Sequence, residues 1–309
     1  MKKFIRDKLF GDVPVTEYCK VTVDGEIQER VFLNTGNKGF DVSATHWLLC
    51  LDPVVFGIWF ERKHEIISFN RSVEYSMHFM DSSVHAGTVA VLKLDLLNAI
   101  EEQDGTLVLL RLRDASMHHI SFIKTRLIYL KYYKKPEQNF YKLKSYAAAY
   151  SYPRRVRLVS FKEGEWYNIF PMDLVGDIPS SRRYVFGLRH SNVTLGRIIE
   201  TKKLSVAEVP YEYKDIIYQL GKHHREPLSE SVSPFEIVPS EFFGFPIPVW
   251  ANSYKEIHIV STMNLGSHML IWGEEVNEKY LNEPHGYLFH IHFLHYLHQK
   301  KRGLIYQFV

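Results

Sequence analysis

Residues 167–192 read YNIFPMDLVGDIPSSRRYVFGLRHSN and contain two prolines and two glycines among strand-like runs of aromatic and β-branched residues. Two polar clusters stand out, NIFPMD at 168–173 and RHSN at 189–192. Each cluster is typical of a turn. Together they also suit two walls of one ligand site, so the surrounding sequence has to distinguish these interpretations.

The composition predicts a packed globular chain. It has 309 residues, of which 46% are hydrophobic and 24% charged, which is enough for two domains or one elaborated domain. The formal net charge of +3 is too small to indicate a nucleic-acid partner. Two cysteines, Cys19 and Cys50, do not make a disulfide framework of the secreted type.

No membrane or secretion signal is expected. The N-terminal sequence MKKFIRDKLFGD lacks the apolar region of a signal peptide. The longest apolar stretch, residues 47–60, is interrupted by Asp52-Pro53 and is too short to span a bilayer. We therefore expect a cytoplasmic protein with no membrane partner.

The first half of the chain, residues 1–145, is predicted to be a β-rich domain. Its strand-like runs are 29–34, 46–51, 54–60, 65–70, 88–94, 106–112 and 125–133, and Asp104-Gly105 is a hairpin-turn signal. Residues 94–103 are predicted as a short helix because Leu96, Leu97 and Ile100 share a helical face. The polar segment 134–139 is the expected linker. Both halves have similar strand content, but the sequence alone does not decide whether the chain contains a duplication.

The second half is again β-rich, with helices predicted at 192–201 and 211–221. Its ordered segments resemble the flavin reductase-like family of FMN-binding split barrels over residues 146–280. The matching segments are PRRVRLV (153–159), NIFPMD (168–173), YVFGLRHSN (184–192), TKKLSVAEV (201–209) and GSHMLIWGE (266–274). The resemblance implies a mainly β, Greek-key split barrel with a few helices, preceded by the additional β-rich domain. Residues 281–309 would form a C-terminal helical extension.

The resemblance also implies a site for FMN. Asn168, Ile169, Pro171, Met172 and Asp173 would run along the flavin ring, although Asp173 stands where the family usually has Ser or Thr. The cluster with cationic and hydroxyl groups would hold the phosphate, with Ser191 or Asn192 capping the following helix. Its members are Arg189, His190, Ser191, Asn192 and Thr194.

Two further histidine-containing segments have a role by the same resemblance. His268, the candidate catalytic residue, would lie near the flavin or nicotinamide and orient the substrate or hydrogen-bond the reduced flavin. Residues 223–225 (HHR) would contact the flavin face or substrate. For both, an ordinary turn or an exposed loop is the alternative.

The histidine-rich tail, residues 290–298, does not favour a metal site, since no carboxylate or cysteine lies at matching spacing. An amphipathic helix that packs on the barrel or on a partner subunit is the preferred interpretation.

Three functions follow as alternatives. The first is an NAD(P)H-dependent flavin oxidoreductase, in which the flavin performs the redox chemistry. Because the sequence contains no Rossmann fingerprint or P-loop, NAD(P)H would bind only transiently over the flavin. The second is a non-catalytic flavin-binding protein whose first half covers the flavin or recruits a partner. The third is a scaffold without cofactor. A homodimer, or a pseudo-dimer within one chain, is expected by analogy with the family.

Overall fold

The computed structural model describes residues 18–23, 26–36, 38–62, 69–81, 87–118, 120–130, 140–228, 235–284, 286–303 and 307–308. These residues form two seven-stranded sheets, one four-stranded sheet and one two-stranded sheet, and every strand pair is antiparallel. The predicted mainly β fold is confirmed. The predicted linker, residues 134–139, lies outside the described ranges.

The first half of the chain forms a sheet in the order β3-β2-β6-β7-β8-β5-β4. In β6 the residues Tyr75, Met77 and Phe79 are buried and alternate with less buried neighbours, as expected of a strand with one face on the core. The strands are β2 (Arg30–Thr35), β3 (Lys38–Asp41), β4 (His46–Leu51), β5 (Val54–Glu61), β6 (Tyr75–Met80), β7 (Thr88–Glu101) and β8 (Gly105–Met117).

The second half forms a sheet in the order β11-β10-β14-β17-β18-β13-β12. Its strands are β10 (Arg157–Glu163), β11 (Trp166–Met172), β12 (Val175–Ile178), β13 (Arg183–Arg189), β14 (Lys203–Glu208), β17 (Ser253–Asn264) and β18 (His268–Tyr280). Two short strands, β15 (Ile237–Pro239) and β16 (Pro246–Pro248), pair separately.

The two seven-stranded sheets have the same topology. When the strands of each sheet are numbered in chain order, both sheets read 2-1-5-6-7-4-3. The first hairpin of each sheet also turns at a glycine with positive φ, Gly36 (56°) and Gly164 (59°). The structure therefore shows an internal repeat of fold, which the sequence alone had left open.

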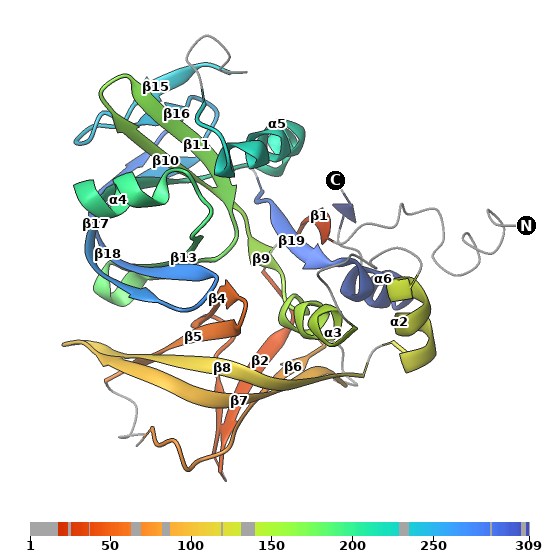
Figure 1. The fold of residues 1–309 in the computed structure, drawn as a ribbon. Helices are drawn as coiled ribbons and strands as arrows, with labels where there is room; N and C mark the ends of the chain where they lie inside the picture. The colour runs from red at the N-terminus through yellow and green to blue at the C-terminus, as the bar shows by residue number, and fades with distance from the viewer. Residues whose placement is uncertain are drawn as a thin grey trace, which may run out of the picture.

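An apolar junction joins the two halves, which lie above one another in Figure 1 with β4 between them. The indoles of Trp59 and Trp272 lie 6.0 Å apart across it. Glycine permits the closest approach, because a Cβ on Gly187 would lie 1.8 Å from the carbonyl oxygen of Leu49. The junction consists of Trp47, Leu49, Cys50, Val55, Trp59, Leu107, Leu109, Ile178, Val185, Leu265, Leu270 and Trp272.

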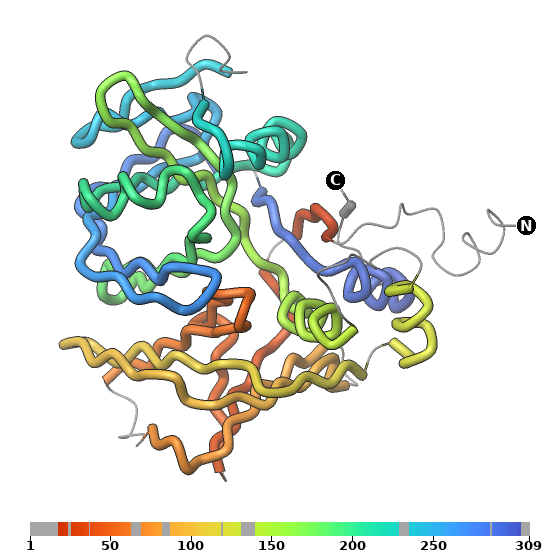
Figure 2. The backbone as a smooth tube through the Cα atoms, viewed as in Figure 1, coloured from red at the N-terminus to blue at the C-terminus, as the bar shows by residue number. Residues whose placement is uncertain are grey.

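The beginning and the end of the described chain meet in the four-stranded sheet, β20-β1-β19-β9 (Figure 2). Its strands are β1 (Tyr18–Thr22), β9 (Arg154–Arg155), β19 (Phe289–His292) and β20 (Gln307–Phe308). The tail therefore contains a strand as well as the predicted helix. That helix, α6 (Phe293–Lys301), packs its apolar face within this chain, with Phe293 and Leu294 buried beside β1 and α3 (Phe140–Ala149).

The histidines of the tail also find partners within the chain. His292 accepts a hydrogen bond from the Leu294 amide at the start of α6. His295 contacts Glu29 at 3.2 Å and His298 contacts Asp81 at 2.9 Å.

Two predictions of secondary structure are wrong. Residues 94–103, predicted as a helix, lie mainly in β7, where a register shift between Leu96 and Asn98 displaces the alternation of side chains and imitates a helical spacing. The described part of 125–133, predicted as a strand, is mostly the helix α2 (Phe122–Ile128), which begins where the Ser121 hydroxyl accepts a hydrogen bond from the Lys124 amide.

The remaining helices are short. They are α4 (Leu195–Thr201), α5 (Lys214–Gln219) and the 3₁₀ turns η2 (Pro179–Ser181), η3 (Tyr211–Tyr213) and η4 (Leu220–His224). None of the helices in the described ranges is long and apolar enough to cross a membrane.

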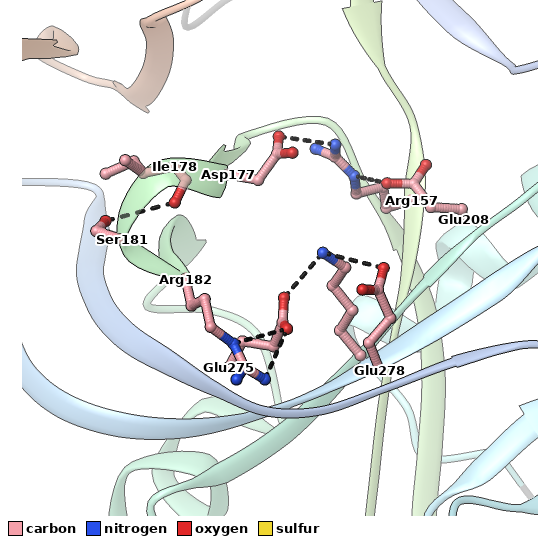
Figure 3. Close-up of polar contacts among 9 residues, drawn as sticks. Arg157, Asp177, Ile178, Ser181, Arg182, Glu208, Glu275 and Glu278 are labelled. Carbon is pink, nitrogen blue, oxygen red and sulfur yellow. Dashed lines mark hydrogen bonds and ion pairs between the residues drawn. The ribbon is translucent and has the colours of Figure 1, made fainter.

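Buried ion pairs fix the second sheet where its strands diverge. Arg157, about 95% buried, lies between Asp177 of β12 and Glu208 of β14, as Figure 3 shows. Burial opposes the charge on Arg157, but the two carboxylates overcome this effect and raise its pKa above the ordinary value. These contacts hold β12, and the chain that leads into it from β11, against β10 and β14.

Candidate functional site

A cavity of about 630 Å³ opens where the two walls predicted from the sequence meet. Its lining comes from the end of β11, the end of β13, η4, the four-stranded sheet and the end of β4 in the first half. The lining residues are Tyr18, Leu51, Tyr150, Val156, Pro171, Met172, Asp173, Leu174, Gly187, Leu188, Arg189, Ser191, Tyr218, Gly221, Lys222, His224, Arg225, Glu226, His268 and His290.

The structure brings six of the predicted site residues together around this cavity. They come from three separate segments of the second half, each entering the cavity at a strand end: Pro171, Met172, Asp173, Arg189, Ser191 and His268. Five predicted residues, Asn168, Ile169, His190, Asn192 and Thr194, do not line it.

Asn168 instead lies behind the cavity lining, where its side chain hydrogen-bonds to neighbouring segments. It is fully buried, and its amide donates to the Thr194 hydroxyl (2.9 Å) and the His223 carbonyl (2.7 Å). Its Oδ1 accepts from the amides of Ile169 and Leu228. Both ends of this side chain are occupied by protein partners, so it ties β11 to the start of α4 and to the loop after η4.

The helix after the second cluster begins later than predicted. Its first residue is Leu195, with Thr194 at the N-cap, and neither Ser191 nor Asn192 caps it. The reason is that the Asn192 Oδ1 accepts a hydrogen bond from the Thr194 amide (2.8 Å), which closes a local turn before the helix. The predicted capping role is therefore wrong.

His224 connects the two predicted walls. Its Nε2 donates to the Pro171 carbonyl at 2.8 Å, since a carbonyl can only accept. Its Nδ1 therefore accepts from the Asn192 amide at 2.9 Å. Burial lowers the pKa of His224, which agrees with a neutral imidazole held in this tautomer. The segments 168–173 and 189–192 are thus two sides of one hydrogen-bonded unit.

Two arginine side chains face the cavity without a carboxylate partner among the described residues. Arg189 and Arg225 line it, and within the described part of the chain neither forms an ion pair with a carboxylate. Lys222 also lines the cavity, but its ammonium is 3.9 Å from the Glu226 carboxylate. Two guanidinium groups with no carboxylate partner in the described ranges, together with the nearby Ser191 hydroxyl, suit an anionic ligand group such as a phosphate monoester.

His268 lies at the contact between the cavity and the junction. Its Nδ1 is 2.8 Å from the Ser267 hydroxyl, which in turn accepts from the Asp52 amide of the first half. Burial, aided by the charge of Arg189, lowers the pKa of His268 to about 4. The His268 ring is therefore neutral at pH 7 and can take part in hydrogen bonds without carrying a charge.

Asp173 is the centre of a polar cluster at the edge of the cavity. Its Oδ2 accepts from the Tyr150 hydroxyl (3.1 Å) and from His290 Nδ1 (3.0 Å). Burial favours the neutral acid, but the hydrogen bonds from His290 and Tyr150 and the charge of Arg154 together lower the pKa of Asp173 below its ordinary value.

Most of the other lining residues could not be recognised from the sequence. Tyr18, Tyr150 and His290 come from the four-stranded sheet and the end of α3, and Tyr218 comes from α5. The one available signal was the loop 223–225, which the sequence analysis associated with the flavin face and of which His224 and Arg225 line the cavity.

Neither a family model nor a curated protein matches this sequence. Solved structures that resemble the chain include an FMN-binding protein from Thermus thermophilus with bound p-hydroxybenzaldehyde, at 20% identity and a TM-score of 0.38, covering 42% of this chain and 73% of that one. They also include the NADH:FAD oxidoreductase SgcE6 of Streptomyces globisporus, at 16% identity and a TM-score of 0.44, covering 50% and 94%.

A third example is nitrilotriacetate monooxygenase component B from Mycobacterium thermoresistibile, at 12% identity and a TM-score of 0.43, covering 48% of this chain and 81% of that one. The structural neighbours are thus flavin reductases and FMN-binding split-barrel proteins, matched over about half of the chain. At these identities the likeness concerns the fold, and the chemistry of the cavity has to come from its own residues.

Proposed function

We propose that this chain binds FMN in the cavity and acts as an NAD(P)H-dependent oxidoreductase of the flavin reductase type. The observation that carries the proposal is the cavity itself, which lies between both predicted walls. It is lined by the Ser191 hydroxyl and by Arg189 and Arg225, which have no ion-pair partner among the described residues. Its volume of about 630 Å³ falls within the range of small-molecule and cofactor sites.

Different lining residues would contact different parts of FMN. Arg189, Arg225 and Ser191 would hold the phosphate through charge-assisted hydrogen bonds. Pro171, Met172 and Leu188 would face the ring, and the neutral His268 would orient the ring or a second substrate. When bound, the flavin supplies the hydride and electron chemistry, and the protein supplies position, charge and exclusion of water.

The first half of the chain would take the place of a partner subunit. It repeats the strand order of the second half, packs against it through the apolar junction, and contributes Leu51 to the cavity lining. We therefore propose a pseudo-dimer within one chain. Light scattering and flavin titration should give a monomer that binds one FMN, whereas an obligatory dimer would contradict this part of the proposal.

The test is direct. The purified protein should bind FMN, measured by quenching of flavin fluorescence, and anaerobic NADH or NADPH should bleach the bound flavin faster than free FMN. Arg189→Ala should weaken FMN binding about 10- to 100-fold, the loss of one charge-assisted contact. Arg111→Ala, which removes an exposed arginine of β8 outside the cavity, is the matched control.

Each outcome has a separate meaning. Unchanged affinity in Arg189→Ala would refute the role of Arg189 in phosphate binding. Bound flavin that neither nucleotide reduces would favour the non-catalytic flavin-binding alternative. A protein that binds no flavin would overturn the proposed function.

A further inference from the structure

A chain of hydrogen bonds that links three distant segments lines the same cavity. The Tyr218 hydroxyl bonds to His290 Nε2, and His290 Nδ1 bonds to Asp173 Oδ2 at 3.0 Å. All three side chains line the cavity, and they come from α5, β19 and the bend after β11. The residues are far apart in the sequence, so only the fold assembles this Tyr218–His290–Asp173 chain.

The direction of each bond follows from the partners. A carboxylate can only accept, so His290 carries its proton on Nδ1 and directs it to Asp173. In the neutral ring Nε2 is then an acceptor, and it receives the Tyr218 hydroxyl. Burial and the nearby charge of Asp173 raise the pKa of Tyr218, so the phenol keeps its proton at neutral pH. In this state the hydroxyl proton is directed at His290 Nε2, and it becomes a donor to a ligand when the hydroxyl rotates about its C–O bond toward the cavity.

Neighbouring groups hold the three side chains in position. The ring of Tyr18 stacks on His290, with 6.3 Å between centroids and 25° between planes. The ammonium of Lys20 lies 3.8 Å from the centroid of the Tyr218 ring and is itself 3.5 Å from Asp215. Tyr150 donates the second hydrogen bond to Asp173. Because each side chain of the Tyr218–His290–Asp173 chain is held in position and lines the cavity, this hydrogen-bonded chain is suited to move a proton to a bound ligand.

We propose that Tyr218 is a catalytic acid that protonates an organic acceptor bound in the cavity, and that His290 and Asp173 are positioning residues that replace its proton. The substrate class is a conjugated carbonyl compound such as a quinone, because the Tyr218 hydroxyl can donate to a carbonyl oxygen while the apolar side chains of the lining, Met172 and Leu188 among them, contact a ring. This inference rests on the proposed flavin function, which supplies the reductant.

The step balances as a two-electron, two-proton reduction. A bound flavin, reduced by the nicotinamide, would supply one hydride with both electrons, which forms one new bond to hydrogen on the quinone. The proton of the Tyr218 hydroxyl forms the second, giving the hydroquinone. The Tyr218 oxygen is then reprotonated through His290: a proton from solvent binds Nε2 of the neutral ring, Nε2 passes it to the Tyr218 oxygen, and His290 returns to the neutral form that donates Nδ1–H to Asp173.

The decisive experiment compares two oxidants of the reduced, FMN-loaded protein. Menadione needs a hydride and a proton, whereas ferricyanide accepts single electrons and needs no proton from the protein. Tyr218→Phe should slow reoxidation by menadione at least about 100-fold, within the range for loss of a general acid, and leave reoxidation by ferricyanide unchanged. Tyr213→Phe is the matched control, since Tyr213 stacks on Trp250 outside the cavity.

The role of His290 is tested by His290→Asn, in which the amide retains a donor toward Asp173 but cannot carry a proton. Menadione reduction should fall and recover in part when imidazole is added, a rescue that a merely structural role would not show. A second test of Tyr218 does not require turnover. The carbonyl stretch of menadione, bound to the oxidised or flavin-free protein, should lie at lower frequency in wild type than in Tyr218→Phe.

The outcomes separate this inference from the proposed function. If all variants bind FMN and Tyr218→Phe is reoxidised by menadione at the wild-type rate, the Tyr218 acid is refuted and the flavin function stands. If wild type binds no FMN, the flavin function fails. The infrared comparison in the flavin-free protein then still decides whether Tyr218 donates to a carbonyl ligand, and identical stretches would overturn that role too.

Discussion

Replacing Gly187 by alanine tests whether the two halves of the chain approach as closely as the structure shows. Gly187 lies in the middle of β13, where it pairs with Leu270 and donates its amide to the Leu174 carbonyl at 2.9 Å. A Cβ at this position would lie 1.8 Å from the Leu49 carbonyl oxygen and 2.6 Å from its carbon. Contacts of a Cβ below 3.0 Å essentially do not occur, so β4 and β13 would have to separate.

The expected cost is large for the addition of one methyl group. Overpacking in a core typically costs about 1–3 kcal/mol, and the obstacle here is backbone of a paired strand that cannot rotate away. We therefore expect Gly187→Ala to lower the free energy of unfolding by about 3 kcal/mol, at the upper end of that range. Because Gly187 also lines the cavity, FMN affinity should fall as well.

The assay is urea denaturation followed by circular dichroism, with FMN titration of the same samples. Gly196→Ala is the matched control, since a Cβ there meets nothing within 4 Å and the residue lies within α4. That variant should be as stable as wild type or gain up to about 1 kcal/mol from helix propensity. If Gly187→Ala unfolds at the same urea concentration as wild type, the close packing of β4 on β13 is not as described.

Three further predictions concern buried polar groups. Arg157→Ala should cost about 3–5 kcal/mol in urea denaturation, because it leaves two carboxylates without their buried partner; a loss below 1 kcal/mol would contradict this. Burial, with the charge of Arg154, lowers the pKa of His46 to about 3, so the stability that its neutral ring contributes is complete above its unfolded pKa, about 6.5, and declines as the pH falls toward 3. Acidification from pH 7 to pH 5 should cost about 2 kcal/mol through this residue; His46→Asn should reduce that loss in denaturation series at both pH values, and the exposed His258→Gln should not. Asn168→Ala should lower stability by about 3 kcal/mol and speed amide exchange in the loop after η4, since it leaves buried backbone groups unpaired; equal exchange would argue against the bracing role.

Local patterns in the sequence determined much of the second half. Runs rich in β-branched and aromatic residues predicted β10, β13 and β18, because such side chains pack well on a pleated sheet. The resemblance of the ordered segments to a known family, carried by NIFPMD, RHSN and GSHMLIWGE among others, implied the split barrel and six of the residues that line the cavity. Local patterns failed in β7, where a register shift changes the period, and in α2, which a polar cap begins.

Only the tertiary structure decided how the cavity is completed. The sequence alone left the repeat of strand order undecided, because a fold constrains burial and pairing more than residue identity. Pairing of β1 with β19 brings Tyr18 beside His290, and the packing of α5 adds Tyr218. These contacts join segments more than seventy residues apart. No local period encodes such contacts, so Asp173 looked like a departure from a motif until the fold placed its two hydrogen-bond donors beside it.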